Sequence, residues 1–255
     1  MKRDGKPLVY LILGAAGSER RDVLADVIEG GLSEGDKAAV LVAQDEVATD
    51  DAPKLPRLAL WTLNGAAIEA ELPQDATHVF FVTDGTKDPV DQIEVFKPWL
   101  ESQGGELASV ICIVNCQLAE KNPALLPWYE ACIYFADVAL LTRREGVANK
   151  WLSDFIAHFK DQFYPCLFEL VKGGRVKNPV LVLDPQPRRM SHYFEEDQDW
   201  LVTNEAGEEV SEDDEPANAE EEVTATVVED PYMVRDAAGR RARRIPDIGK
   251  FIGGD

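Results

Sequence analysis

The sequence is poor in the residues from which catalytic and metal sites are most often built. Its 255 residues include only 3 histidines and 4 cysteines. None of the histidines is spaced with a cysteine or serine in a catalytic pattern, so each is better explained as a structural residue. The cysteines lie mostly within apolar runs, which is typical of reduced, buried thiols in a cytosolic protein. Cys112 and Cys116 offer two metal ligands, but no further ligand cluster stands near them, and we predict no metal site.

Long apolar runs are also missing, and no stretch is long enough to span a bilayer. Residues 1–17 have a basic end and an apolar run that superficially resemble a signal peptide. The run is short, Gly14 interrupts it, and an amphipathic segment follows at once, so a buried first strand explains it better. We therefore expect a cytoplasmic protein that does not bind membranes.

Basic residues are absent from one long stretch of the chain. No Lys or Arg occurs between Ser191 and Val234, whereas Glu195–Asp230 contains 16 acidic residues. The whole chain has a net charge of −21, and the residues outside that acidic stretch account for only −5 of it. Such a molecule would repel a phosphate backbone, so we do not expect a nucleic acid as partner.

What the chain does contain is a strand–turn–helix pattern near its start. Residues 7–13 form an apolar run typical of a buried strand, residues 14–18 a turn of small residues, and residues 19–29 carry apolar side chains at helical spacing. In this arrangement the amide groups of the turn and the helix dipole face one point, which suits a phosphate group. We interpret it as a degenerate phosphate loop; the alternative is an ordinary first βα turn of an α/β protein. The loop equivalent consists of Gly14, Ala15, Ala16, Gly17, Ser18, Glu19, Arg20 and Arg21.

Three substitutions remove the chemistry of a phosphate loop, whose motif is G-x-x-x-x-G-K-[ST]. Glu19 stands where a glycine lets the backbone approach the phosphate, and it adds a negative charge. Arg20 replaces the lysine that reaches the phosphates, and Arg21 replaces the hydroxyl that holds Mg²⁺; a guanidinium cannot ligate a metal. We predict that the loop is inactive as an NTPase site. The two guanidinium groups could bind a retained phosphate or could pair with Asp84 and Asp88, and the sequence leaves both open.

Further along, strand-like and helix-like segments alternate, and no internal repeat is evident. Predicted strands are residues 38–43, 58–63, 78–83, 107–114, 138–141, 166–171 and 180–183; predicted helices are residues 90–101, 124–135 and 147–163. This alternation is typical of βαβ units. We predict an α/β fold with a mostly parallel sheet and helices on both faces, similar to that of P-loop NTPases.

Four turns follow predicted strands and should gather at one edge of the sheet, where ligands bind in such folds. They are residues 14–18, 84–89, 115–117 and 142–145. The second of them, a switch-like turn, includes Thr83, Asp84, Gly85, Asp88 and Pro89. Turn capping explains its two aspartates better than acid–base catalysis, and we assign no catalytic residue. This edge is the candidate site.

The character of the chain changes after residue 187. We predict a domain over residues 1–187, an acidic and largely disordered linker over 188–230, and a basic–apolar segment over 231–255. That segment could dock on another protein or fold back onto its own chain, and the charge pattern does not separate the two. Removal of residues 195–255 should leave the stability of the domain nearly unchanged. The candidate contact residues of the basic–apolar segment are Tyr232, Arg240, Arg241, Arg243, Arg244, Ile248 and Phe251.

Four short motifs follow one another between residues 8 and 145. They read LILGAAGSERRDVL (11–24), VTDGTKDP (82–89), VICIVN (110–115) and ADVALLTRRE (136–145). In this order they resemble the motifs of the CobW/HypB/UreG class of P-loop GTPases, and CobW-type proteins most closely. The resemblance implies a GTPase-type fold for this part of the chain and says nothing about the tail.

The departures from that family fall on its chemistry. Thr142, Arg143 and Glu145 stand where the family has the Asn, Lys and Asp that select guanine, and Val82 replaces an acidic residue that helps to place Mg²⁺. CobW-type metallochaperones carry a Cys-x-Cys-Cys motif, but the matching turn at residues 64–69 has no cysteine or histidine. Phosphoryl transfer relies on lysine and Mg²⁺ together, so the resemblance implies a pseudo-GTPase.

We therefore consider three functions. The first is a catalytically inactive GTPase-like domain that needs no cofactor and serves as a protein-interaction or scaffold module. It would contact its protein partner through the rim, that is, the edge of the sheet where the four turns gather, or through the basic–apolar segment. The second is a nucleotide-binding regulator or slow NTPase, in which Arg20 and Asp84 do the work of the lost residues and GTP or another nucleotide binds. The third is a metallochaperone-like protein that uses Cys112 and Cys116. Some relatives associate with themselves through the P-loop face, so the resemblance also makes a homo-oligomer an option.

Overall fold

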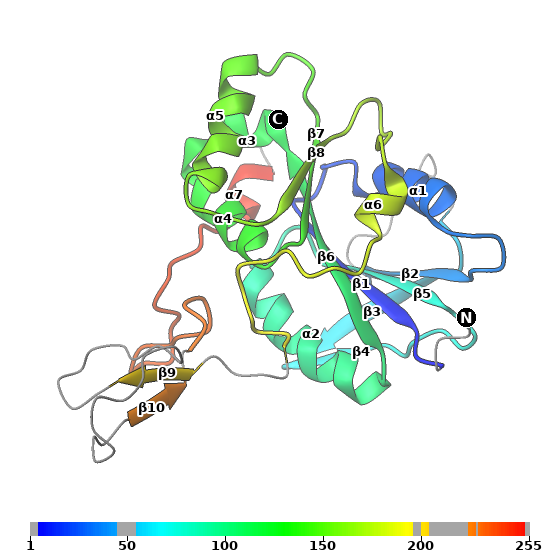
Figure 1. The fold of residues 1–255 in the computed structure, drawn as a ribbon, viewed down its shortest axis with the longest axis horizontal. Helices are drawn as coiled ribbons and strands as arrows, with labels where there is room; N and C mark the ends of the chain where they lie inside the picture. The colour runs from blue at the N-terminus through cyan, green and yellow to red at the C-terminus, as the bar shows by residue number, and fades with distance from the viewer. Residues whose placement is uncertain (1–4, 45–54, 196–199, 204–223, 228, 253–255) are drawn as a thin grey trace, which may run out of the picture. The chain divides into compact units, whose positions relative to one another are not determined.

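The computed structural model describes residues 5–44, 55–195, 200–203, 224–227 and 229–252 (Figure 1). The chain forms two compact units, the first made of residues 1–190 and 244–255 and the second of residues 191–243. These limits differ from the predicted boundaries at residues 187 and 230. None of the described helices is long and apolar enough to cross a membrane.

The first unit is built on an eight-stranded sheet in the order β4-β3-β2-β5-β1-β6-β7-β8. Every neighbouring pair is parallel except β3 and β4, which are antiparallel. The predicted α/β fold with a mostly parallel sheet is therefore confirmed. The strands are β1 (Leu8–Gly14), β2 (Ala38–Ala43), β3 (Leu58–Asn64), β4 (Ala67–Glu69), β5 (His78–Val82), β6 (Glu106–Asn115), β7 (Val138–Thr142) and β8 (Leu167–Leu170).

Helices cover both faces of this sheet, as Figure 1 shows. They are α1 (Arg20–Gly31), α2 (Pro89–Gln103), α3 (Cys116–Lys121), the 3-10 turn η2 (Pro123–Leu125), α4 (Leu126–Tyr134), α5 (Asn149–Lys160), α6 (Pro179–Val182) and α7 (Gly249–Ile252). Apolar residues of α1 and α6 pack on one face with Tyr10 and Phe80. On the other face Phe81 contacts Phe96 and Trp99 of α2, and Phe168 contacts Phe159 of α5.

The central strands are buried along their whole length because both faces are covered. All seven residues of β1 and all six of β2 are buried, which is typical of parallel strands between two helical layers. Their continuous apolar runs are the reason that the sequence predicted them within one residue. Strand β3, next to the edge strand β4, is less covered, and Leu58 and Leu60 remain about half exposed.

One predicted strand is wrong. Residues 180–183 lie in and just after helix α6, and Pro179 occupies the first helical turn, where its missing N–H costs nothing. The helix rests on the end of α1, where two glycines leave room for it. A Cβ on Gly31 would lie 2.7 Å from Cδ1 of Leu183. Neighbours far away in the sequence thus decided the conformation of this short apolar run.

Two further elements were not foreseen. The predicted turn at residues 115–117 is instead the start of α3, with the Asn115 side chain accepting the Leu118 amide as N-cap. The short strand β4 lies within the turn named above at residues 64–69 and pairs with β3. Both elements are too short to give a periodic signal.

The second unit contains part of the stretch that was predicted to be a disordered linker. Strands β9 (Trp200–Thr203) and β10 (Thr224–Val227) pair antiparallel within it. Residues 196–199, 204–223 and 228, which hold most of the acidic side chains, lie outside the described residues, so disorder there stays a prediction. The Arg-rich part includes a small hairpin with a bridge between Arg235 and Arg241; residues 234–243 are hereafter called the arginine hairpin.

The predicted basic–apolar segment is divided between the units. Residues 231–243 belong to the second unit, whereas residues 244–252 belong to the first. Ile248 is only 1% exposed. The next residue, Gly249, approaches the switch-like turn, with its Cβ position 3.9 Å from the carbonyl oxygen of Thr86. This end of the chain is therefore part of the folded first unit.

Candidate functional site

The rim at the carboxyl ends of the parallel strands is the candidate site. Strands β5, β1, β6 and β7 are successive neighbours, so the turns that follow them lie side by side. The Ala16 amide donates to the Gly85 carbonyl oxygen (3.0 Å). The Asn115 amide group donates to Gly17 O at 3.3 Å, and the Thr142 hydroxyl lies 3.0 Å from Ser18 O. The predicted gathering of the four segments at one edge is confirmed.

The loop equivalent of residues 14–21 is held closed by its own contacts. The Ser18 hydroxyl is buried and donates to the Ala15 carbonyl oxygen at 2.7 Å. Gly14 has a φ of 142°, and a Cβ there would lie 2.5 Å from Ile113 O, so only glycine fits. The bond from the Ala16 amide to the Gly85 carbonyl oxygen also occupies an N–H of the kind that cradles phosphate in a working loop.

Arg20 fills the space between the loop and the switch-like turn. The residue is 7% exposed, and its Nη1 donates to the Thr83 carbonyl oxygen at 2.6 Å. Its Cδ lies 3.3 Å from the Cβ position of Gly14, and its Nη2 lies 2.7 Å from that of Gly85. The Arg20 side chain thus lies against the glycines of both turns, with its Cδ at Gly14 and its guanidinium at Gly85. The two options left open by the sequence, a bound phosphate and pairing with Asp84 and Asp88, stay predictions beside this contact with a backbone carbonyl.

Two other substituted positions meet across the rim. Glu19 Oε1 and Arg143 Nε form an ion pair at 2.9 Å. Both residues have left-handed backbones, with φ of 60° and 50°. Glu19 also occupies the N-cap position of α1 without a side-chain cap to the helix, because its carboxylate is directed to the arginine. The pair links the loop equivalent to the base-recognition equivalent.

The aspartates of the switch-like turn serve as caps, as predicted. Asp84 Oδ1 accepts from the amide and hydroxyl of Thr86 at 2.8 and 2.6 Å. Asp88 caps α2 by accepting from the Val90 and Asp91 amides, and Pro89 is the first residue of that helix. The sequence gave no reason to single out Gln92, but its side-chain amide holds the backbone of Asp84. Its Oε1 accepts from the Asp84 amide at 2.6 Å, and its Nε2 donates to the Asp84 carbonyl oxygen at 2.9 Å. Its only signal is a polar side chain on the buried face of α2.

Thr142 and Glu145, the remaining residues of the base-recognition equivalent, form hydrogen bonds with neighbouring segments of the rim. Thr142 is buried, and its hydroxyl lies 3.0 Å from both Ser18 O and Val114 O. Glu145 takes part through its backbone, since its carbonyl oxygen accepts from Gln117 Nε2 at 2.6 Å. Arg21 lies half-buried on the first turn of α1. Hydrogen bonds therefore link the four rim segments to one another.

The cysteines are buried and stand apart from other groups that ligate metals. Within the described ranges no three His, Cys, Asp or Glu side chains are grouped so as to hold a metal ion. Cys112 and Cys116 are fully buried, and burial raises the pKa of the Cys116 thiol to about 12. Metal ligation needs a thiolate, which such burial disfavours.

The candidate contact residues of the C-terminal segment are placed in two groups. In the second unit, Arg241 Nη1 donates to Tyr232 O at 3.0 Å, and the Arg243 guanidinium lies 4.7 Å from the centroid of the Tyr232 ring. Arg240 Nε pairs with Asp236 at 3.2 Å, and this carboxylate's pKa is lowered by hydrogen bonds from Arg240 and Ala238. Arg244, Ile248 and Phe251 lie in the first unit.

The chain was compared with known proteins. No family model matches it, and no curated protein matches it. Among solved structures, it is similar to the Zn(II)-bound YjiA GTPase from E. coli and to a Zn(II)-bound triple mutant of YjiA. For each, the identity is 16%, the TM-score is 0.41, and the match covers 78% of this chain and 72% of the other. The similarity is one of fold.

Proposed function

We propose that the first unit is a GTPase-like domain that does not hydrolyse nucleotides, and that the protein works by binding another protein. The observation that carries this proposal is the position of Arg20. Its side chain lies over Gly14 and Gly85 and is bonded to the Thr83 carbonyl oxygen. A phosphate group would need that space and the neighbouring amide groups.

Charge neutralisation argues in the same direction. Phosphoryl transfer depends on a lysine and Mg²⁺ that together balance the charge of the transferred group. Here the carboxylate of Asp84 is engaged by Thr86, and that of Glu19 by Arg143. Neither is left facing a metal ion. We therefore expect no bound nucleotide and no required cofactor.

The arginine hairpin is the proposed contact surface for the partner. Arg240 and Arg243 are exposed, and the hairpin backbone is fixed by Asp236, which accepts from the Ala238 and Arg240 amides. A fixed turn that presents guanidinium groups suits recognition of carboxylates, because the fork of arginine binds them with two hydrogen bonds. We expect the partner to present an acidic surface.

Titration calorimetry of the full chain with GTP, GDP and ATP, with and without Mg²⁺, tests the first half of the proposal. We expect no saturable heat. A variant with Glu19→Gly, Arg20→Lys and Arg21→Thr provides a comparison in which the motif is restored. Saturable micromolar binding by the unmodified chain would overturn the proposal and favour a nucleotide-binding regulator.

The proposed binding of a protein partner through the arginine hairpin is tested by affinity capture with the full chain and two variants. Arg240→Glu with Arg243→Glu should lose a partner that the unmodified chain retains, whereas Lys160→Glu, on the exposed end of α5, should retain it. Equal capture by all three proteins would exclude the arginine hairpin as the contact surface. Sedimentation analysis of the same samples would show whether the partner is a second copy of this chain.

A further inference from the structure

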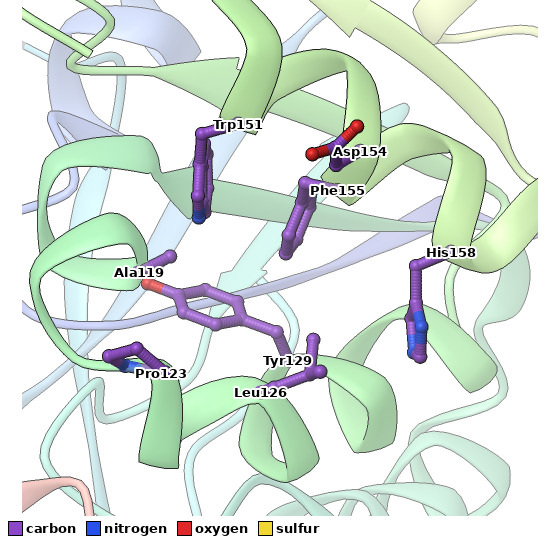
Figure 2. A pocket seen from close by; sticks show the side chains of 8 residues that line it. All are labelled: Ala119, Pro123, Leu126, Tyr129, Trp151, Asp154, Phe155 and His158. Carbon is purple, nitrogen blue, oxygen red and sulfur yellow. The ribbon is translucent and has the colours of Figure 1, made fainter. Parts of the chain in front are cut away.

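A pocket away from the rim lies between α5 and the segment formed by α3, η2 and α4 (Figure 2). Its volume is about 250 Å³. The side chains that line it are Ala119, Pro123, Leu126, Tyr129, Trp151, Asp154, Phe155 and His158. None of them belongs to the rim, so a ligand in this pocket would be independent of the proposed function.

The walls of this pocket are mainly aromatic. Trp151 stacks on Phe155, with ring centroids 5.0 Å apart and an angle of 21° between the planes. Tyr129 meets Phe155 edge-on at 6.2 Å and 87°. Leu126 and Pro123 close the side opposite α5, as Figure 2 shows. Such walls suit a flat apolar ring, and the volume lies just below the roughly 300–1,000 Å³ of sites for drug-sized molecules, so one fused ring system with a short side chain fits.

The charge at the pocket is negative. Asp154 is the one carboxylate among the lining residues, and it pairs with Lys150 at 2.6 Å. Both side chains of that pair are largely exposed, at 62% and 85%, and exposed pairs of this kind contribute little stability. A second cation can therefore replace Lys150 at low cost. The other titratable lining residue, His158, is held by Glu130 at 2.7 Å, which adds a second carboxylate behind the imidazole.

We propose that this pocket binds a small, flat aromatic molecule that carries a protonated amine. The ring packs among Trp151, Phe155 and Leu126, and the ammonium group takes the place of Lys150 beside Asp154. Proximity to the faces of aromatic rings also favours a cation. The residues outside the acidic stretch carry a net charge of −5, which acts in the same direction because it raises the local concentration of cations.

Three probes with the same ring and different charge test the proposal: tryptamine, 3-methylindole and indole-3-propionate. Each is titrated into the full chain and followed by ligand-observed NMR. We expect tryptamine to bind about three- to fivefold more tightly than 3-methylindole, the ratio that an exposed ion pair supplies. Indole-3-propionate should bind more weakly than either. Absence of saturable binding by all three probes, or equal binding of the anion and the cation, would overturn the proposal.

Variants of the full chain assign the binding to this pocket. Asp154→Asn should abolish the preference for tryptamine and leave 3-methylindole unchanged, whereas Asp161→Asn, an equal change of charge at an exposed position just after α5, should alter neither. Lys150→Gln should tighten tryptamine by removing its competitor. Trp151→Ala should weaken all three probes, with circular dichroism to verify folding. Binding that is the same in Asp154→Asn and Trp151→Ala as in the unmodified chain would place the probes elsewhere and refute the assignment.

Discussion

Glu19 and Arg143 are joined by an ion pair of 2.9 Å that ties the first loop of the domain to the turn after β7. In the sequence, Glu19 replaces a glycine of the phosphate loop and Arg143 replaces a lysine of the base-recognition turn, and the two substitutions have no evident connection. In the structure they are partners. With side-chain exposures of 28% and 44%, the pair adds little stability by itself, but it fixes the two turns relative to each other.

Replacement of Arg20 by alanine should destabilise the first unit. The change removes a charged hydrogen bond to Thr83 O and empties the space over Gly14 and Gly85. We expect the free energy of unfolding to fall by about 1.5–3 kcal/mol, the contribution of a hydrogen bond with a charged partner. Urea denaturation measures it. Arg175→Ala, at an exposed position, should change it by less than about 0.5 kcal/mol; similar losses in both variants would contradict the role of Arg20.

Asp137 should be among the most sensitive polar positions. It is fully buried and accepts from the Val110 and Arg188 amides at 2.7 and 2.6 Å and from the Arg189 guanidinium at 2.9 Å. Asp137→Asn leaves a buried arginine without its counter-charge, and we expect a loss of about 3–5 kcal/mol. Thermal unfolding provides the measurement. Asp154→Asn is the surface control, and a cost below about 1 kcal/mol at Asp137 would refute the interpretation.

The end of the chain should contribute to the stability of the first unit. The sequence predicted that removal of residues 195–255 would be nearly neutral, but Ile248 is buried in the folded unit. Ile248→Ala should therefore cost about 2–5 kcal/mol, the usual range for a buried isoleucine. Ile252, which is only half-buried, gives a matched control whose substitution should cost less. The melting temperatures of both variants, measured by calorimetry, test this expectation. An unchanged melting temperature for Ile248→Ala would support the prediction that removal of residues 195–255 is nearly neutral.

Stability should decline above pH 9 because of the buried thiols. Burial raises the Cys116 pKa from 9.0 to about 12 and raises that of Cys132 and Cys166 as well. Below pH 9 both the folded and unfolded states hold the protons, so the full stability is present. Between pH 9 and 12 only the unfolded state releases them, and each thiol costs about 1.4 kcal/mol per pH unit.

Denaturation curves between pH 8 and 11 test this dependence, and Cys116→Ala should reduce the slope by one proton. An identical slope in the variant would show that other groups dominate. In the native state at pH 8 the thiols of Cys116, Cys132 and Cys166 should also resist alkylation, because they are neutral and covered.

Phe163 should be replaceable by glycine with a gain in stability. It follows α5 with a φ of 60° and is 88% exposed, and the adjoining amides close the helix through Phe163 N to Lys160 O and Tyr164 N to Phe159 O. Glycine adopts this left-handed conformation without strain, so Phe163→Gly should stabilise by up to about 1 kcal/mol. Lys160→Gly, at the last residue of α5, should instead destabilise, by less than about 1 kcal/mol. Chemical denaturation measures the free energy of unfolding of both variants, and the two changes should have opposite signs.

The sequence by itself determined the α/β class and most of the buried strands, because parallel strands covered on both faces need uninterrupted apolar runs such as those of β1 and β2. It also determined that the four turns share one rim, since strand direction alone places them there. The helical state of residues 179–182 was decided only by packing on Gly30 and Gly31, and the burial of Ile248 only by contact with distant parts of the chain.

The same division holds at the site. Composition and motif spacing identified Glu19, Arg20 and Arg143 as departures from a phosphate site. That Arg20 bonds Thr83, 63 residues away, and that Glu19 meets Arg143 required the tertiary structure. A sequence specifies local conformation through short-range sterics and periodicity, whereas the partner of a charged side chain depends on which distant segments the fold brings within hydrogen-bond reach.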